Sequence, residues 1–88
     1  MSCLISYDLN APGKNYDQLY DAIKSLGGWW HHLDSTWIVT HAGPATAIRD
    51  KLKPYLDHND KLLVVHCSGE AAWTGFNSRG SQWLKDHL

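Results

Sequence analysis

The spacing of hydrophobic residues changes along this chain between the period of a strand and the period of a helix. Residues 3–7 form a short apolar run, whereas apolar residues between 16 and 26 recur at three- and four-residue intervals. Two runs rich in aromatic and β-branched residues follow at 29–33 and 35–40, and such runs are typical of strands. The chain is therefore predicted to begin as strand, helix and a pair of strands.

Residues at the ends of the helical patterns predict where two helices begin and end. Asn15 is the expected N-cap of the first helix, Gln18 stands at the capping-box position, and Gly27-Gly28 ends it. A second helix is expected from Gly43-Pro44, with proline at its first position, to Pro54. The residues expected to face the core from these helices are Tyr16, Leu19, Tyr20, Ile23, Leu26, Ala45, Ile48, Leu52 and Tyr55.

The second half of the chain adds a strand and a short tail. Residues 61–67 are almost continuously apolar, which predicts a strand inside the sheet. The tail is expected to form a short edge strand at 69–76 and a helical stub at 82–88 that Ser81 caps. Strand, helix, strand pair, helix, strand is the split βαβ order, so we expect one α+β, ferredoxin-like domain over residues 1–88. Its antiparallel sheet carries two helices on one face.

Composition narrows the possible partners. Eight Lys and Arg against nine Asp and Glu leave a formal charge of −1, which lacks the strong basic field of a protein that coats nucleic acid. Five Trp and four Tyr exceed what a small core needs, so we expect an aromatic interface and a homodimer. No apolar run approaches the ~20 residues of a membrane helix, and a cytoplasmic protein is expected. Cys3 and Cys67 are interpreted as buried thiols.

The main candidate for chemistry is Asp8, which follows the first apolar run and enters the polar loop 10–15. A carboxylate at the rigid end of a strand suits a hard cation such as magnesium. Asp is also common at such positions because its side chain accepts hydrogen bonds from the amides that follow. The residues alone leave both interpretations open.

A second group of candidates follows from the expected topology. The first and third strands should be neighbours, which brings Asp8 close to the region of Ser35. A carboxylate, hydroxyl groups and an aromatic platform together can hold a metal-bound phosphate with a base stacked beside it. Their presence is also explained by turn and strand preferences alone. The expected substrate contacts are Tyr7, Asn10, Thr36 and Trp37.

Several other kinds of site are excluded. His31 and His32 are adjacent on a predicted strand and point to opposite faces, so they do not share a metal ion. The loop Pro12-Gly13-Lys14 lacks the glycine spacing of a phosphate-binding loop, which argues against nucleotide hydrolysis. No histidine-hydrophobic-histidine triplet is present to support a tyrosine nucleophile.

The run Leu4–Leu9, a helix ending at Leu26-Gly27 and the run Leu33–Val39 resemble those of a known group of proteins. They resemble the small CRISPR-associated ferredoxin-like proteins that accompany the spacer integrase, and the related VapD ribonucleases. The resemblance covers about residues 3–67. Within the group the chain is most similar to small proteins described as SinR-like.

This resemblance implies a function. Asp8 matches the acidic residue that binds magnesium, with two copies facing each other across a dimer groove, and Ser35 matches the family serine. The implied reaction is hydrolysis of a phosphodiester. Relatives usually carry Gln or a similar polar residue just before the serine, where this chain has Leu33-Asp34. The chain is also less basic than members that hold a DNA duplex.

Two main functional hypotheses result, and a small-ligand sensor domain of the ferredoxin-like kind is a more distant third. The first is a magnesium-dependent endonuclease, expected to act on RNA, in which a homodimer places two copies of Asp8 near its twofold axis. It requires a second acidic group or a general base near Asp8, and the candidates are Asp34 and His32. The second is a noncatalytic dimeric adaptor, in which Asp8 caps a loop and the tail around Trp73 and Phe76 contacts the partner.

Overall fold

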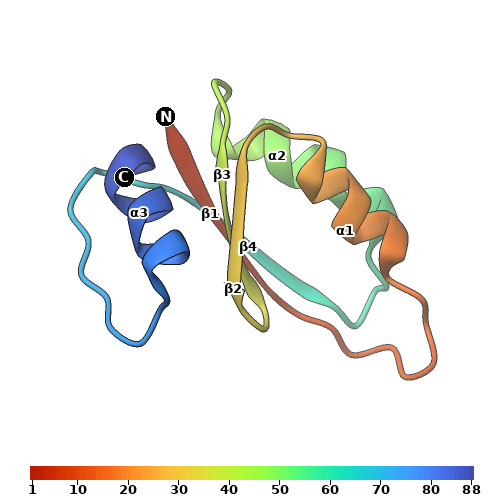
Figure 1. The fold of residues 1–88 in the computed structure, drawn as a ribbon. Helices are drawn as coiled ribbons and strands as arrows, with labels where there is room; N and C mark the ends of the chain where they lie inside the picture. The colour runs from red at the N-terminus through yellow and green to blue at the C-terminus, as the bar shows by residue number, and fades with distance from the viewer.

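A four-stranded antiparallel sheet forms the middle of the molecule and has helices on both faces (Figure 1). The structure is a computed structural model that describes residues 1–88. Its elements are β1 (Ser2–Asp8), α1 (Asp17–Lys24), β2 (Trp29–Leu33), β3 (Thr36–Thr40), α2 (Ala45–Leu52), a 3₁₀ turn (Lys53–Tyr55), β4 (Lys61–His66) and α3 (Ser78–His87). The strand order is β2-β3-β1-β4. The α+β class is confirmed, and the architecture is compatible with the expected ferredoxin-like domain.

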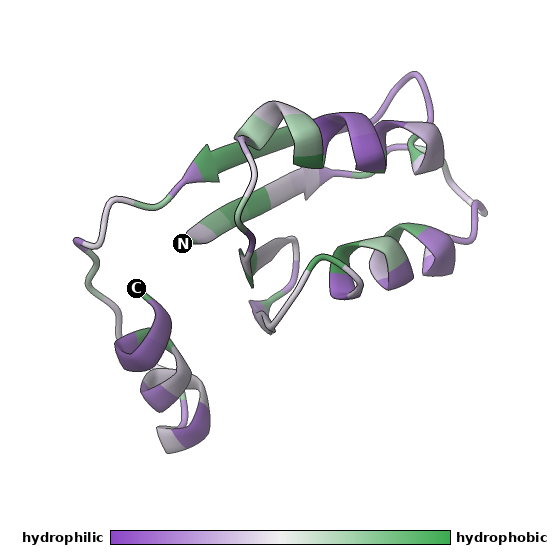
Figure 2. Ribbon diagram, turned by 90° about the horizontal axis from the view of Figure 1, so that it is seen from above, coloured by the Kyte–Doolittle hydropathy of each residue, from purple (hydrophilic) through white to green (hydrophobic).

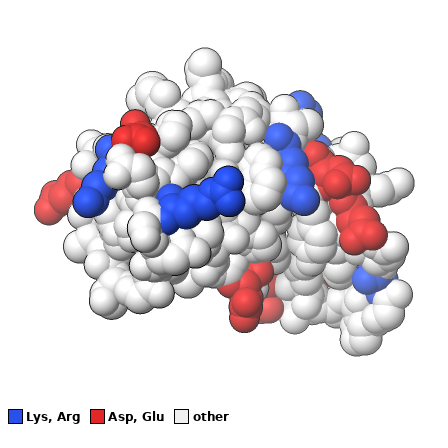
Figure 3. Space-filling view, in the orientation of Figure 1, with Lys and Arg blue, Asp and Glu red and all other residues white.

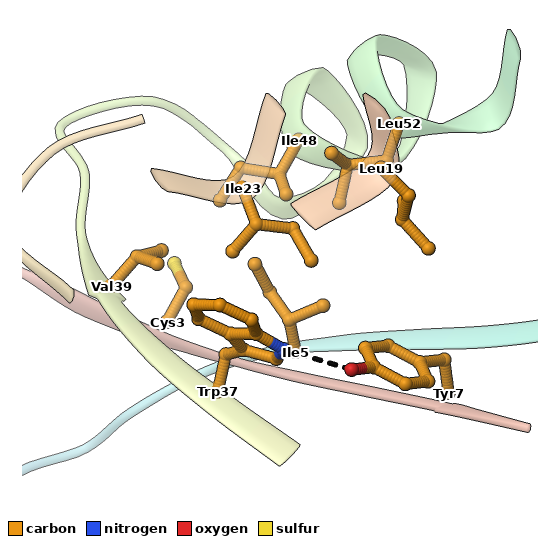
Figure 4. Packing of buried hydrophobic residues seen from close by; sticks show 9 residues of the cluster. All are labelled: Cys3, Ile5, Tyr7, Leu19, Ile23, Trp37, Val39, Ile48 and Leu52. Atoms are coloured by element: carbon orange, nitrogen blue, oxygen red, sulfur yellow. Dashed lines mark hydrogen bonds between the residues drawn. The ribbon is translucent and has the colours of Figure 1, made fainter. Parts of the chain in front are cut away.

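The main core lies between the sheet and helices α1 and α2, as Figures 1 and 4 show. Alternate residues of β1 and β3 point to this face because side chains alternate along a strand. The helices contribute residues at four-residue spacing, which places them on one stripe. The buried members are Cys3, Ile5, Tyr7, Leu19, Ile23, Trp37, Val39, Ile48 and Leu52. The prediction that Tyr55 belongs to the core is wrong, because its side chain is 36% exposed and Leu56 packs against the core instead.

A second, smaller core lies on the opposite face of the sheet, beneath α3 (Figures 1 and 2). Trp30 of β2 and Ile38 of β3 contact Leu84 of α3 here. The aromatic residues Trp73, Phe76 and Trp83 pack around them. Of the five Trp residues, only Trp29 is exposed, so the apparent surplus of aromatic residues is largely used within the chain.

Strand β4 corrects one expectation, because it is an edge strand and not an internal one. Its sequence is continuously apolar because hydrophobic residues point to both faces of the strand. Leu62 and Val64 pack on the main core, whereas Leu63 and Val65 are 59% and 45% exposed on the other face. A continuous apolar run indicates that other residues can cover both faces of a strand. It does not indicate whether the strand lies inside the sheet or at its edge.

The tail corrects a second expectation, because residues 69–76 form an irregular segment and not an edge strand. Gly69 and Gly75 have φ values of 95° and 91°, which are not compatible with an extended strand. The helix that follows is confirmed, but it begins earlier than expected. Its cap is Asn77, whose side chain accepts a hydrogen bond from the Gly80 amide at 2.8 Å, and Ser81 lies inside the helix.

The ends of the other helices also differ in detail from the sequence pattern. Helix α1 begins at Asp17 with Tyr16 at the N-cap, and the Asn15 side chain accepts a hydrogen bond from the Asp17 amide at 2.8 Å. The capping box that includes Gln18 does not form. Glycine at position 27 is required by packing, because a Cβ there would collide with the backbone oxygen of Thr40. None of the helices is long and apolar enough to cross a membrane.

Candidate functional site

Asp8 is the last residue of β1 and its side chain is exposed. Tyr7 beside it points into the main core, so strand alternation directs Asp8 to the face that carries α3. Its partner in the register is Lys61 of β4. The carboxylate has no hydrogen bond or ion pair within the chain, and only the backbone oxygen of Asp8 accepts a hydrogen bond, from Asn10 Nδ2 at 3.3 Å. Asp8 therefore does not cap the turn that follows it.

Asp60 holds that turn instead. Its carboxylate accepts hydrogen bonds from the Asn10 amide at 2.6 Å, the Asp57 amide at 2.7 Å and the Tyr16 hydroxyl at 2.8 Å. Burial tends to raise the pKa of the Asp60 carboxyl, but these hydrogen bonds and the charge of Lys14 hold it below its usual value. No sequence pattern predicts this role, because Asp60 lies fifty positions from Asn10 and stands in an ordinary polar loop.

The expected proximity of Asp8 and Ser35 is confirmed. Strands β1 and β3 are neighbours, and the Tyr7 amide donates a hydrogen bond to the Ser35 oxygen at 3.1 Å. On the same face as Asp8, the hydroxyls of Ser6 and Thr36 lie 3.3 Å apart. Ser35 is exposed in the turn between β2 and β3. The structure thus gathers one free carboxylate and three hydroxyl groups at this end of the sheet.

Two predicted substrate contacts do not belong to this group. Trp37 is 1% exposed and Tyr7 is 8% exposed, and both point toward α1 and α2. The Trp37 indole donates a hydrogen bond from Nε1 to the Tyr7 hydroxyl at 3.0 Å (Figure 4). Burial raises the pKa of the Tyr7 hydroxyl above its usual value. A stacking platform for a base must be open to solvent, so that role for Trp37 is corrected to a core role.

Asn10 lies near Asp8, but its side chain is already engaged. Its amide nitrogen donates to the backbone oxygens of Asp8 at 3.3 Å and Asn59 at 3.0 Å. These bonds join the loop after β1 to the loop before β4. Asn10 therefore stabilises the site region from within, and it is not free to contact a substrate without breaking these bonds.

The histidine pair behaves as its strand position predicts. His31 stacks on Trp37, with ring centroids 3.7 Å apart, whereas His32 lies on the other face at 5.1 Å from Trp30. The two imidazoles cannot share an ion. His32 contacts aromatic rings of the second core, and Asp34 lies in the exposed β2–β3 turn. No group of three or more His, Cys, Asp or Glu residues is placed to hold a metal ion.

The remaining charges and thiols add no further chemistry to this region. Figure 3 shows basic and acidic side chains scattered over one face of the molecule, with no continuous basic surface. Cys3 is fully buried and Cys67 is half-buried, and both are free. Burial raises the pKa of both thiols, which makes them poor nucleophiles at neutral pH.

Comparison with known proteins does not assign a family. No family model matches the chain, and no curated protein matches it significantly. The placement of Asp8 and its neighbours is therefore the main indication of function.

Proposed function

We propose that this protein is a homodimeric, metal-dependent endonuclease whose expected substrate is RNA. The observation that carries the proposal is the free carboxylate of Asp8 at the exposed end of β1. An Asp that served only to end a strand would accept hydrogen bonds from the amides after it. Asp60 accepts that bond from Asn10 here, so the Asp8 carboxylate remains available to a ligand.

The fold supports the same proposal. We infer that the sheet with α1 and α2 is the ferredoxin-like split βαβ fold, because the order β2-β3-β1-β4 with antiparallel neighbours is what two interlocked βαβ units produce. This inference agrees with the resemblance to the CRISPR-associated and VapD-like proteins. The resemblance assigns Asp8 and Ser35 to the active site. Asp8 ends β1, and Ser35 lies in the turn just before the neighbouring strand β3.

A magnesium site would require a second copy of the chain. Each copy supplies one carboxylate, so two Asp8 side chains would hold the ion, with the hydroxyls of Ser6, Ser35 and Thr36 nearby for the phosphate. Magnesium bound there would activate water and screen the charge of a phosphodiester. Leu63 of β4, which is 59% exposed, lies on the same face and supports self-association through it.

A noncatalytic dimeric adaptor is the alternative. One observation favours it: Lys61 faces Asp8 in the β1–β4 register, and a neighbouring ammonium reduces the affinity of a carboxylate for a cation. One feature of that hypothesis is corrected, because Asp8 does not cap the loop. Trp73 and Phe76 pack on their own sheet and stay partly exposed, so their contact with a partner remains a prediction.

The test is cleavage of labelled single-stranded RNA, single-stranded DNA and duplex DNA with magnesium, with manganese and with chelator. The native protein is compared with Asp8→Asn and with Asp21→Asn, a control that removes an exposed carboxylate from α1. We expect metal-dependent cleavage of RNA that Asp8→Asn abolishes and Asp21→Asn retains. Sedimentation verifies equal dimer content. Absence of cleavage, or equal cleavage by both variants, would support the adaptor.

A further inference from the structure

A cavity of about 490 Å³ lies on the α3 face of the sheet; Thr36 is among its lining residues, but Asp8 is not. Its floor includes Leu4 of β1 and Ile38 of β3, and its sides include Val65 of β4 and Trp30 of β2. Residues 67–76, which we call the strap, and helix α3 supply the rest of the lining. The cavity is therefore bounded by the sheet, the strap and the helix.

The lining is strongly apolar. Hydrophobic residues make up 12 of its 17 lining residues. Both indole groups in the wall already have partners, since Trp30 donates from Nε1 to the Gly80 oxygen at 3.1 Å and Trp73 donates to the Ser81 hydroxyl at 3.3 Å. They therefore have no unpaired N–H group to offer a ligand. The polar side chains of the lining are the hydroxyls of Thr36, Ser68 and Thr74, the imidazole of His66 and the carboxylate of Glu70.

Side-chain contacts, and not backbone hydrogen bonds, hold residues 68–76 of the strap in place. Residues 68–76 form no backbone–backbone hydrogen bond, in contrast to the strands on either side of the cavity floor. Gly69 and Gly75, both with positive φ, flank the segment that crosses the cavity. Trp73 and Phe76 hold that segment through contacts with the second core. A ligand can enter by moving this segment without breaking the sheet.

We propose that this cavity binds a small, uncharged, mainly apolar molecule that contains one or more rings. The volume lies within the range of about 300–1,000 Å³ typical of small-molecule sites. A dry apolar cavity of about 150 Å³ already accepts benzene, so this one has room for two or three fused rings. A second copy of the chain would meet the strap and α3 before the floor, where Ile38 is only 7% exposed.

The test uses the neutral dye N-phenyl-1-naphthylamine, which fluoresces in apolar surroundings, titrated into the full chain. We expect saturable binding of one dye per chain, with energy transfer from tryptophan. Val65→Trp places an indole at the cavity wall and should weaken binding by at least about tenfold. Leu63→Trp adds the same side chain to the same face of β4 but outside the cavity, and should retain the native affinity.

Each other outcome overturns the proposal. Absence of saturable binding, equal weakening by both variants, or dye binding that only dissociates a dimer would show that no small-molecule site exists here. If Val65→Trp fails to fold by circular dichroism, Ala72→Phe decides instead, because Ala72 lines the cavity from the exposed strap. Asp8→Asn should bind the dye normally, so failure of the nuclease proposal and failure of this one are distinguishable.

Discussion

The indole of Trp37 and the hydroxyl of Tyr7 form a hydrogen bond of 3.0 Å inside the main core. The two residues belong to neighbouring strands, β3 and β1, and both face α1. The ring of Tyr20 from α1 lies 6.2 Å from the Tyr7 ring and 6.3 Å from the Trp37 ring. A buried polar pair enclosed by rings in this way helps to specify how β1, β3 and α1 pack together.

Removing the Tyr7 hydroxyl tests this relationship. Tyr7→Phe leaves the buried Trp37 N–H without an acceptor, so we expect the free energy of unfolding to fall by about 1–3 kcal/mol. Urea denaturation followed by tryptophan fluorescence measures it. Tyr55→Phe, which removes a hydroxyl from a residue that is 36% exposed, should change stability little. Equal stability of Tyr7→Phe and the native protein would contradict the hydrogen bond.

Asp8 is predicted to contribute little to stability. Because its carboxylate bonds to nothing in the chain, Asp8→Ala should change the free energy of unfolding by no more than about 0.5 kcal/mol. Thermal and urea unfolding of the variant provide the measurement. A loss well above that value would mean that Asp8 does hold the turn, and would return it to the structural role of a cap.

Asp60 is predicted to make stability depend on pH in the acid range. Its pKa is lower in the folded protein than in the unfolded chain, so the unfolded state binds more protons as the pH falls. The contribution of Asp60 is therefore complete above its unfolded pKa of about 3.9 and is lost as the pH falls through the lower folded value.

Comparison of the native protein with Asp60→Asn between pH 7 and pH 2.5 measures this effect. We expect the variant to be less stable at pH 7, because the three hydrogen bonds that Asp60 accepts are strengthened by its negative charge, and the Asn side chain is uncharged. The difference between the two proteins should shrink toward pH 2.5. A difference that stays constant over this range would rule out titration of Asp60 as its cause.

Leu84 is predicted to hold α3 against the sheet. It is 2% exposed and contacts Trp30 and Ile38, so Leu84→Ala should cost about 2–4 kcal/mol in the free energy of unfolding. Lys85→Ala, an exposed change on the same helix, is the control. Near-ultraviolet circular dichroism should also weaken, because Trp30 loses its packing. Equal unfolding of both variants would argue that α3 does not dock as described.

Local pattern was enough to predict most of the elements and part of the candidate site. Helix periodicity depends only on residues within about two helical turns of one another. It therefore correctly predicts four buried core residues, Leu19, Ile23, Ile48 and Leu52. The proximity of Asp8 and Ser35 followed from the order of the elements. By contrast, the role of Asp60 could not be predicted, because its partners Asn10 and Tyr16 are distant in sequence.

The sequence by itself determined the α+β class, the two helices on one face and the strand that ends at Asp8, since each depends on the spacing of nearby side chains. Only the tertiary structure decided that β4 lies at an edge and that the tail crosses to the other face. It also decided that Trp37 is buried while the Asp8 carboxylate is free. These features depend on contacts between distant segments. The type of a residue, hydrophobic or polar, does not indicate which distant segment will pack against it.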